Sequence, residues 1–308
     1  MVSIQTKVLE QVVRLVGVKR RLARVAAVTG DPDKLAKLVK SLRRPDLLKP
    51  PRRMRRSWVH ERVEIEGWPL HLLTKPDGPS RRVILYLHGG GYMFGPALFE
   101  WLAAGSMAES AGCDLAMFVY PKAPEYQAPF TVAVTLRAFA EVADRYGAAD
   151  VVVVGTSAGG GLAVVTMTEL RDRGLLQPSL AVLISPGVDV AIEADVSHLE
   201  KGDVLLSVGF TRGAGTLYAG ALGLRHPHVS PAFGDLAGLA PMHVLAGTKE
   251  ILYPGLETFV GRVSDAGGEA HLIVGEGQQH TWPTAPTPEG RRALRQIVEI
   301  IGASNPSG

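Results

Sequence analysis

The stretch that decides the fold is Val151-Val152-Val153-Val154-Gly155-Thr156-Ser157-Ala158-Gly159-Gly160-Gly161, followed by the apolar run Leu162-Ala163-Val164. Four consecutive β-branched side chains predict a buried strand, and the apolar run predicts a helix after it. Between them stands the pattern G-x-S-x-G, whose small residues allow a tight, strained turn from strand to helix. We therefore expect Ser157 to project from a sheet as a nucleophile that needs a neighbouring base. A phosphate-binding loop is disfavoured because G-x-x-x-x-G-K-[ST] is absent.

Outward from this turn, strand-like and helix-like segments alternate. Such alternation predicts a mostly parallel sheet with helices on both faces, and two earlier strands at 59–65 and 70–74 would fit as antiparallel strands at one edge. The expected strands are 82–87, 114–119, 151–154, 180–184, 242–246 and 270–274, and the expected helices are 97–111, 129–145, 158–173, 254–266 and 288–301.

The first 56 residues have a different character. Apolar side chains at helical spacing predict a helix over 4–28, and Asp31-Pro32 predicts the start of a second helix through Leu42. Three prolines at 45, 50 and 51 then mark a boundary. We expect an N-terminal helical cap over 1–56 and a catalytic domain over 57–308, in which the irregular insertion at about 187–232 contributes to the cap.

A second glycine cluster, His88-Gly89-Gly90-Gly91, follows the strand at 82–87. Consecutive glycines leave backbone N–H groups unobstructed, so those of Gly90 and Gly91, together with that of Ala158, would form an oxyanion hole. Gly89 and His88 would support the motif, with His88 holding the loop.

The base must be one of nine histidines. Where a G-x-S-x-G serine works with an acid and a histidine, the chain order is serine, acid, histidine, each on a loop after a strand. His280 fits this order because it follows the strand at 270–274 and the loop at 275–279. His271 lies inside that strand and is expected to be a strand residue.

Glu250 is the expected acid because it follows the strand at 242–246 through Gly247-Thr248-Lys249. Its task would be to hold the imidazole tautomer and to stabilise the imidazolium. Asp189 is the main rival, with loop capping as its alternative role. Asp235 precedes the strand, and Glu257 and Asp265 fall within or beyond the next helix.

The charge distribution is uneven. Residues 1–56 contain 16 Lys/Arg and four Asp/Glu, a net charge of +12, although the whole chain carries only +3. This basic segment could be a solvated cap that complements the acidic body, and it is also compatible with weak contact to anionic membranes. No nucleic-acid-binding module accompanies the charge, so we expect no nucleic-acid partner.

The remaining composition indicates a globular protein, with 46% hydrophobic residues and a single cysteine, Cys113, which cannot form an internal disulfide. Charged residues interrupt every apolar run near the N-terminus, so no signal peptide is expected. We expect a cytoplasmic protein. The sequence leaves the oligomeric state open, and a homodimer is compatible with it.

The motifs together resemble the hormone-sensitive-lipase-like family of α/β-hydrolases, which includes bacterial carboxylesterases. The likeness covers about residues 80–301 and rests on the two glycine motifs, with further support from the following segments: Tyr120-Pro121-Lys122-Ala123-Pro124-Glu125, Ser230-Pro231, Gly238-Leu239-Ala240-Pro241 and Gly247-Thr248-Lys249-Glu250-Ile251-Leu252-Tyr253-Pro254. Two departures stand out. The family's acid is more often Asp, and a second acidic residue often found after it is here Gly255.

The resemblance implies the α/β-hydrolase fold, an N-terminal helical cap over the acyl pocket, no metal or other cofactor, and hydrolysis of short- to medium-chain carboxylic esters through an acyl-enzyme. The same triad serves lactonases, deacetylases and amidases, and Trp282 and Tyr92 near the site would suit a cyclic or specialised substrate. A non-catalytic ligand-binding relative of the fold is the remaining alternative.

Overall fold

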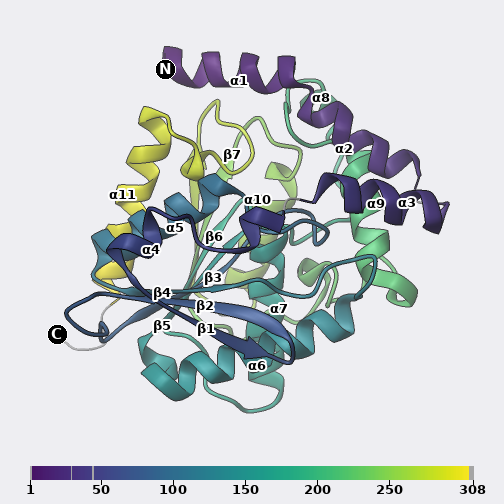
Figure 1. Ribbon diagram of the computed structural model, residues 1–308. Helices are drawn as coiled ribbons and strands as arrows, with labels where there is room; N and C mark the ends of the chain where they lie inside the picture. The colour runs from purple at the N-terminus through teal and green to yellow at the C-terminus, as the bar shows by residue number, and fades with distance from the viewer. Residues whose placement is uncertain (1, 29, 44, 305–308) are drawn as a thin grey trace.

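The computed structural model describes residues 2–28, 30–43 and 45–304, and it places eight strands in one sheet (Figure 1). The strands follow the order β1-β2-β4-β3-β5-β6-β7-β8 across the sheet. Their bounds are β1 Val59–Ile65, β2 Trp68–Thr74, β3 Val83–Leu87, β4 Asp114–Phe118, β5 Val151–Thr156, β6 Leu180–Ile184, β7 Met242–Gly247 and β8 Ala270–Gly275.

The sheet is parallel from β4 to β8, and β1 and β2 are antiparallel at one edge. This is the predicted arrangement. β5 is fully buried and lies between β3 and β6, which explains its uninterrupted apolar sequence. Because parallel strands end at the same edge, the loops after β3, β5, β6, β7 and β8 converge there.

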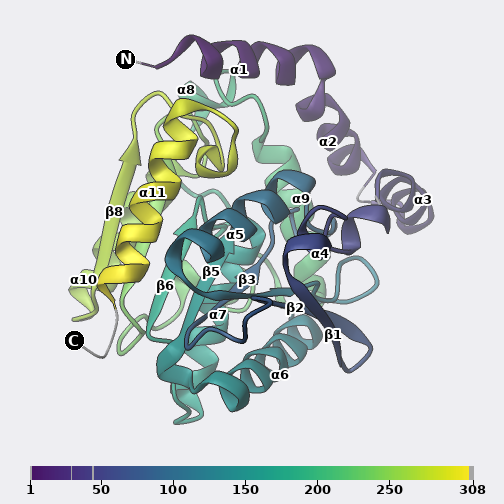
Figure 2. The same ribbon diagram turned by 60° about the vertical axis from the view of Figure 1, so that its left-hand side comes forward.

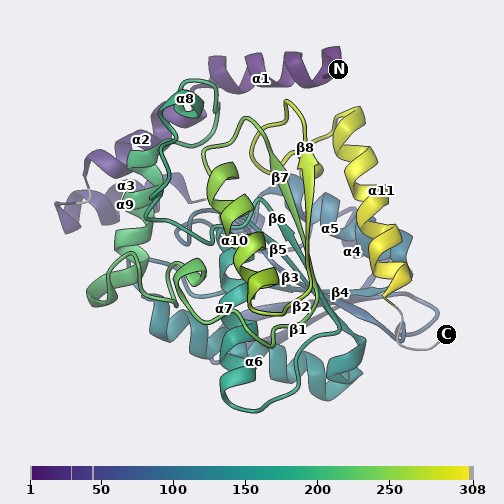
Figure 3. The same ribbon diagram turned by 180° about the vertical axis from the view of Figure 1, so that it is seen from behind.

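Helices cover both faces of the sheet (Figures 2 and 3). One buried cluster joins α5 and α11 to side chains of alternate strand positions, and the other joins α6, α7 and α10 to the intervening positions. The longer helices are α1 Ile4–Val16, α2 Val18–Ala27, α3 Pro32–Leu42, α5 Leu98–Ala111, α6 Ala128–Tyr146, α7 Ala158–Asp172, α9 Val208–Ala219, α10 Tyr253–Asp265 and α11 Pro288–Ala303. The short helices are α4 Met54–Ser57 and α8 Ser197–Glu200, with 3₁₀ turns at η1 Pro45–Leu48, η2 Ala148–Asp150, η3 Gly220–Leu222, η4 Pro231–Phe233 and η5 Trp282–Thr284.

The prediction of one helix over 4–28 was wrong, because Gly17 divides the segment into α1 and α2. Gly17 has a φ of 71°, and its N–H caps the carbonyls of Val13 and Arg14. The apolar spacing continues through this break, so periodicity alone did not reveal it. The change of direction matters, since α1 crosses the top of the molecule while α2 descends beside α9 (Figure 1).

The turn from β5 to α7 fixes the position of Ser157. Ser157 has φ 53° and ψ −118°, a conformation that L-residues rarely adopt. The turn also packs backbone against backbone, because a Cβ placed on Gly159 would lie 2.0 Å from the carbonyl oxygen of Leu87 and 2.4 Å from that of His88. A side chain at position 159 would therefore push α7 away from β3.

Replacement of Gly159 by Ala should destabilise the fold by about 2 kcal/mol or more, since the clash is with main-chain atoms that cannot rotate away. Urea denaturation monitored by circular dichroism measures this free energy. Gly261→Ala in α10 is the matched control, because nothing lies within 4 Å of a Cβ there. It should raise the free energy of unfolding by about 0.5–1 kcal/mol. Equal stability of the two variants would contradict the packing argument.

Candidate active site

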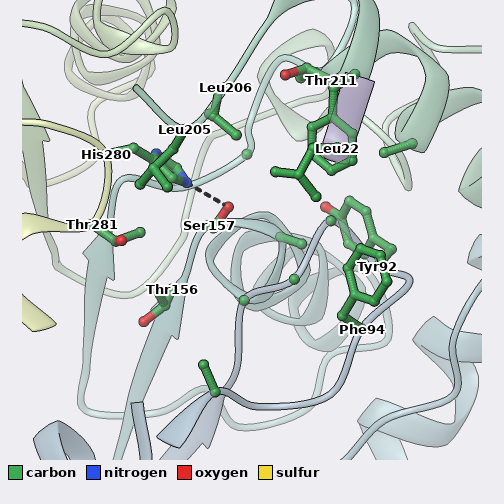
Figure 4. Close-up of a pocket in the computed structure, with 18 of the residues that line it drawn as sticks. Leu22, Tyr92, Phe94, Thr156, Ser157, Leu205, Leu206, Thr211, His280 and Thr281 are labelled. Carbon is green, nitrogen blue, oxygen red and sulfur yellow. Dashed lines mark hydrogen bonds between the residues drawn. The ribbon is translucent and has the colours of Figure 1, made fainter. Parts of the chain in front are cut away.

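Ser157 and His280 face each other across the carboxyl edge of the sheet (Figure 4). The Oγ atom of Ser157 lies 2.9 Å from Nε2 of His280, although 123 residues separate them in sequence. Ser157 stands at the amino end of α7, and His280 follows β8 through the loop at 275–279. The geometry places the imidazole where it can accept the serine proton.

Glu250 completes the contact on the far side of the imidazole. Its Oε2 atom lies 2.5 Å from Nδ1 of His280, and the carboxylate is fully buried. Its Oε1 atom accepts hydrogen bonds from the N–H of Gly247 at 2.7 Å and from the hydroxyl of Ser185 at 2.8 Å. Both oxygens therefore have partners, which a buried carboxylate requires.

Ser185 is a supporting residue that the sequence analysis missed. It follows β6, and its Oγ atom donates to Glu250 and accepts from the N–H of Thr281 at 3.0 Å. The hydroxyl of Ser185 thus links Glu250 to Thr281, the residue after His280. The position of Ser185 at the end of a parallel strand was a usable sequence signal, but the carboxylate of Asp189 on the same loop was the more obvious candidate.

Asp189, the main rival of Glu250 for the role of the acid, does not contact His280 among the described hydrogen bonds. Asp189 accepts three backbone N–H bonds, from residues 191, 192 and 193, so it caps its own loop. Gly255, where the family often has an acid, faces the side chain of Asp189, since a Cβ on it would lie 3.8 Å from Cβ of Asp189. His271 lies in β8 and is exposed beside Glu269.

The glycine loop after β3 borders the same place. Gly90 and Gly91 have φ values of 109° and 59°, and both line the cavity beside Ser157 together with Ala158. Among residues 2–28, 30–43 and 45–304, no hydrogen bond uses the backbone N–H of Gly90, Gly91 or Ala158. Three free donors at a cavity wall form the arrangement that an oxyanion needs.

His88 lies behind this loop. Its ring is fully buried and stacks on Tyr120 with centroids 4.2 Å apart, and the hydroxyl of Tyr120 donates to the carbonyl of His88 at 2.8 Å. Burial and the neighbouring Lys122 hold the pKa of His88 well below its ordinary value. A neutral, packed ring is consistent with a residue that holds the loop.

Glu100 also holds the loop, and no sequence pattern pointed to this role. From α5 its carboxylate accepts the N–H of Gly89 at 2.6 Å and that of Ala97 at 2.8 Å. Burial raises the pKa of Glu100 to about 7, although the two hydrogen bonds and the nearby His280 act in the opposite direction. The position of Gly89 is thus stabilised by a hydrogen bond to α5, which follows it in the chain.

A cavity of about 260 Å³ opens above Ser157 (Figure 4). Its walls are mostly apolar, and they combine the glycine loop with side chains from distant segments: Leu22, Tyr92, Phe94, Val190, Leu205, Leu206, Phe210 and Leu252. Leu22 belongs to α2 and Phe210 to α9, so both the N-terminal helices and the 187–232 region reach the cavity.

A second apolar cavity, of about 230 Å³, lies between the inner face of α1 and the 278–287 loop. Leu9 and Val13 of α1 line it, and it shares Phe99, Leu205 and His280 with the first cavity. His280 therefore forms part of the lining of both cavities.

Neither a metal centre nor a membrane span is found in the described part of the chain. No group of three or more His, Cys, Asp or Glu side chains is placed there to hold a metal ion. Likewise, none of the described helices has the length and apolar character needed to cross a bilayer.

Known proteins share this architecture and sequence. Residues 84–284 match the family described as the alpha/beta hydrolase fold. The chain is 31% identical over 234 residues to an acetyl-hydrolase of Streptomyces hygroscopicus, covering 75% of this chain and 77% of that protein. It is 26% identical over 231 residues to an esterase of Acinetobacter venetianus, covering 73% and 76%. A solved esterase from the bacterial hormone-sensitive lipase family superposes with a TM-score of 0.77 at 28% identity, covering 93% and 99%.

The chain therefore belongs to the α/β-hydrolase fold family. Within it, the predicted likeness to hormone-sensitive-lipase-like members is confirmed. The predicted fold class is confirmed as well.

Replacement of Glu100 by Gln tests its support of the glycine loop. At acid pH the carboxyl group of Glu100 is protonated, but its carbonyl and hydroxyl oxygens can each still accept one of the two N–H groups. The amide nitrogen of Gln cannot accept, so the variant should lose about 1–3 kcal/mol of stability at acid pH. The raised pKa of Glu100 means that the folded protein binds the proton more tightly than the unfolded chain does. The stabilising contribution is thus complete below the ordinary pKa of 4.5 and lost as pH rises through about 7.

The free energy of unfolding, measured in urea at about pH 5 and about pH 8, should show the gap between wild type and variant narrowing by up to about 2–3 kcal/mol. Glu109→Gln, an exposed position on the same helix, should show no such change. A gap that stays constant with pH would mean that Glu100 does not titrate in this range.

Proposed function

We propose that this chain is a serine carboxylesterase that hydrolyses short- to medium-chain esters through an acyl-enzyme. The observation that carries the proposal is the continuous contact from Ser157 to His280 to Glu250, with distances of 2.9 Å and 2.5 Å, at the floor of an apolar cavity. The names of the relatives, an acetyl-hydrolase and esterases, support the same activity.

In the first step, Nε2 of His280 removes the proton from Ser157 as the serine oxygen attacks the ester carbonyl. The imidazolium that forms is stabilised by the carboxylate of Glu250 at Nδ1. Because Gly247 and Ser185 bond to the other oxygen of Glu250, the carboxylate is held in line with the ring.

The negative charge on the carbonyl oxygen is stabilised by the N–H groups of Gly90, Gly91 and Ala158. These donors already line the cavity, so no reorganisation is needed when the charge develops. The amino end of α7 adds a favourable dipole at the same position.

Collapse of the tetrahedral intermediate breaks the bond to the alcohol, which leaves with the proton held by His280. The carboxylic acid remains bound to Ser157 as an ester. Water, deprotonated by His280, then attacks this acyl-enzyme and releases the acid, which restores the serine hydroxyl.

The size and lining of the cavity support the substrate range. A volume of about 260 Å³ is at or below the small end of ligand pockets, which are roughly 300 Å³ and larger. An uncharged acyl chain would contact the apolar side chains of Leu205, Leu206 and Phe210. We propose that residues 1–56 and 187–232 form the cap, because Leu22 and Phe210 close the cavity from these two segments.

Hydrolysis of p-nitrophenyl acetate, butyrate and octanoate by wild type and Ser157→Ala tests the proposal. The variant should lose turnover by a factor of about 10⁴ or more, since it retains the oxyanion donors but lacks the nucleophile. A fluorophosphonate probe should label Ser157 in wild type only, and the acetate and butyrate should react faster than the octanoate. Ser110→Ala, at an exposed position on α5, is the control. Undiminished turnover in Ser157→Ala would overturn the assignment.

Glu250→Gln tests the acid. An amide facing Nδ1 no longer holds the required tautomer, so kcat should fall by about 10³–10⁴ while the fold is retained. Glu257→Gln in α10 is the matched control and should keep full activity, because Glu257 bonds only to Tyr253 among the described contacts. Loss of activity in Glu257→Gln with retention in Glu250→Gln would reverse the assignment.

A further inference from the structure

Helix α1 presents an apolar stripe to solvent. The stripe consists of Ile4, Val8, Val12, Leu15 and Val16, which recur at helical spacing on the outward side. Ile4 is 77% exposed and Leu15 is 86% exposed, which are unusually high fractions for aliphatic side chains. A contiguous exposed apolar face of this kind is typical of a contact surface.

The stripe is not needed to hold α1 in place, because the opposite side of the helix makes the contacts with the body. Glu289 of α11 accepts hydrogen bonds from the main chain and hydroxyl of Ser3 and from the hydroxyl of Thr6, at 2.6–2.8 Å. Glu10 pairs with Lys249 at 2.9 Å, and Leu9 and Val13 line the second cavity. The helix is thus tethered on its inner side and unoccupied on its outer side.

Basic side chains accompany the stripe. Lys7 is exposed on α1, and Arg20, Arg21 and Arg24 are exposed on α2 directly after it. Arg14 on α1 is also exposed, but it donates to the carbonyl of Gly202 in the body at 3.2 Å. The only acid on α1, Glu10, faces the body in its pair with Lys249. Figures 1 and 2 both show α1 and α2 at the outer boundary of the molecule. The outward surface of these helices therefore combines apolar and positively charged groups.

We propose that α1 docks on an anionic lipid surface, with the apolar stripe at the boundary between headgroups and acyl chains and the arginines of α2 against lipid phosphates. A helix with an apolar face, flanking basic residues and insufficient length to span a bilayer lies in the plane of the interface. Anionic headgroups supply the charge complementarity that the excess of +12 in residues 1–56 requires.

Charge also argues against the two other occupants of such a surface. A second copy of the chain would bring one set of exposed arginines against another, which disfavours pairing through this face. A nucleic acid would engage the arginines but leave the aliphatic stripe in water. A lipid surface has anionic headgroups for the arginines and an apolar layer below them for the aliphatic stripe, so it can contact both parts of this face.

Docking would place the cavities close to the lipid, because the same helix that contacts the membrane lines the second cavity with its inner side. Half-exposed Phe99, which lines both cavities, lies at this end of the molecule. Docking would then allow apolar esters to pass from the bilayer to the active site. This consequence rests on the proposed esterase function, but the docking itself does not depend on that function.

The test is co-sedimentation of the full chain with vesicles of phosphatidylcholine alone and of phosphatidylcholine with about one quarter phosphatidylglycerol. Binding is expected to the anionic vesicles and to weaken as salt is raised. The double variant Ile4→Ser/Leu15→Ser should reduce the partition coefficient at least about tenfold, since two aliphatic side chains no longer enter the interface. Neutralising Arg20, Arg21 and Arg24 to Gln should reduce it by roughly fivefold for each charge.

The matched control is Leu175→Ser/Leu176→Ser, two leucines that are 55% and 78% exposed after α7. This pair should bind vesicles as wild type does. All variants should retain wild-type turnover of a soluble ester and wild-type circular dichroism, which separates loss of docking from loss of folding or of the proposed activity.

Two outcomes would overturn the proposal. One is equal vesicle binding by wild type and the Ile4/Leu15 double variant. The other is a wild-type dimer in sedimentation velocity that this double variant converts to a monomer without any vesicle binding, since a second copy would then be the occupant of the stripe.

Discussion

The close approach of backbones at the turn from β5 to α7 is the constraint on which the rest of the structure depends. Ser157 adopts its strained conformation where α7 packs directly against the end of β3. At Gly159, the carbonyl oxygens of Leu87 and His88 leave no room for a side chain. The same contact sets the distance between the amino end of α7 and the glycine loop. Ser157, the backbone N–H groups of Gly90, Gly91 and Ala158, and the cavity floor therefore depend on one packing interaction for their relative positions.

The positions of Glu250 and His280 depend on the sheet in a different way. Glu250 and His280 follow neighbouring strands, β7 and β8, so their loops begin at the same edge, yet the final alignment comes from polar contacts between loops. Ser185 joins Glu250 to Thr281, and Gly247 holds the second contact to the carboxylate. These bonds hold the carboxylate of Glu250 beside the imidazole of His280.

Features that depend on local sequence patterns could be predicted from the sequence, whereas features that depend on contacts between distant segments could not. The strands, most helices and the order of Ser157, Glu250 and His280 follow from periodicity and from the parallel sheet. Gly17 escaped notice because the apolar spacing continues across it. Glu100 and Ser185 escaped because an isolated acid in a helix, or a serine after a strand, has no distinguishing pattern. Their roles exist only once the loops that they join have met in space.

The charged side chains of the basic N-terminal segment fall into two groups, those that contact the body and those that remain exposed. Some of its charged groups are used against the body: Arg43 forms a bidentate pair with Glu125, Lys19 bonds to the carbonyls of Glu200 and Asp203, and acidic Glu10 meets Lys249. These contacts complement the acidic body and hold the helices over the cavity. Arg20, Arg21 and Arg24 remain exposed on the outer side. The proposed docking of the outer face rests on these unused positive charges and on the apolar stripe beside them.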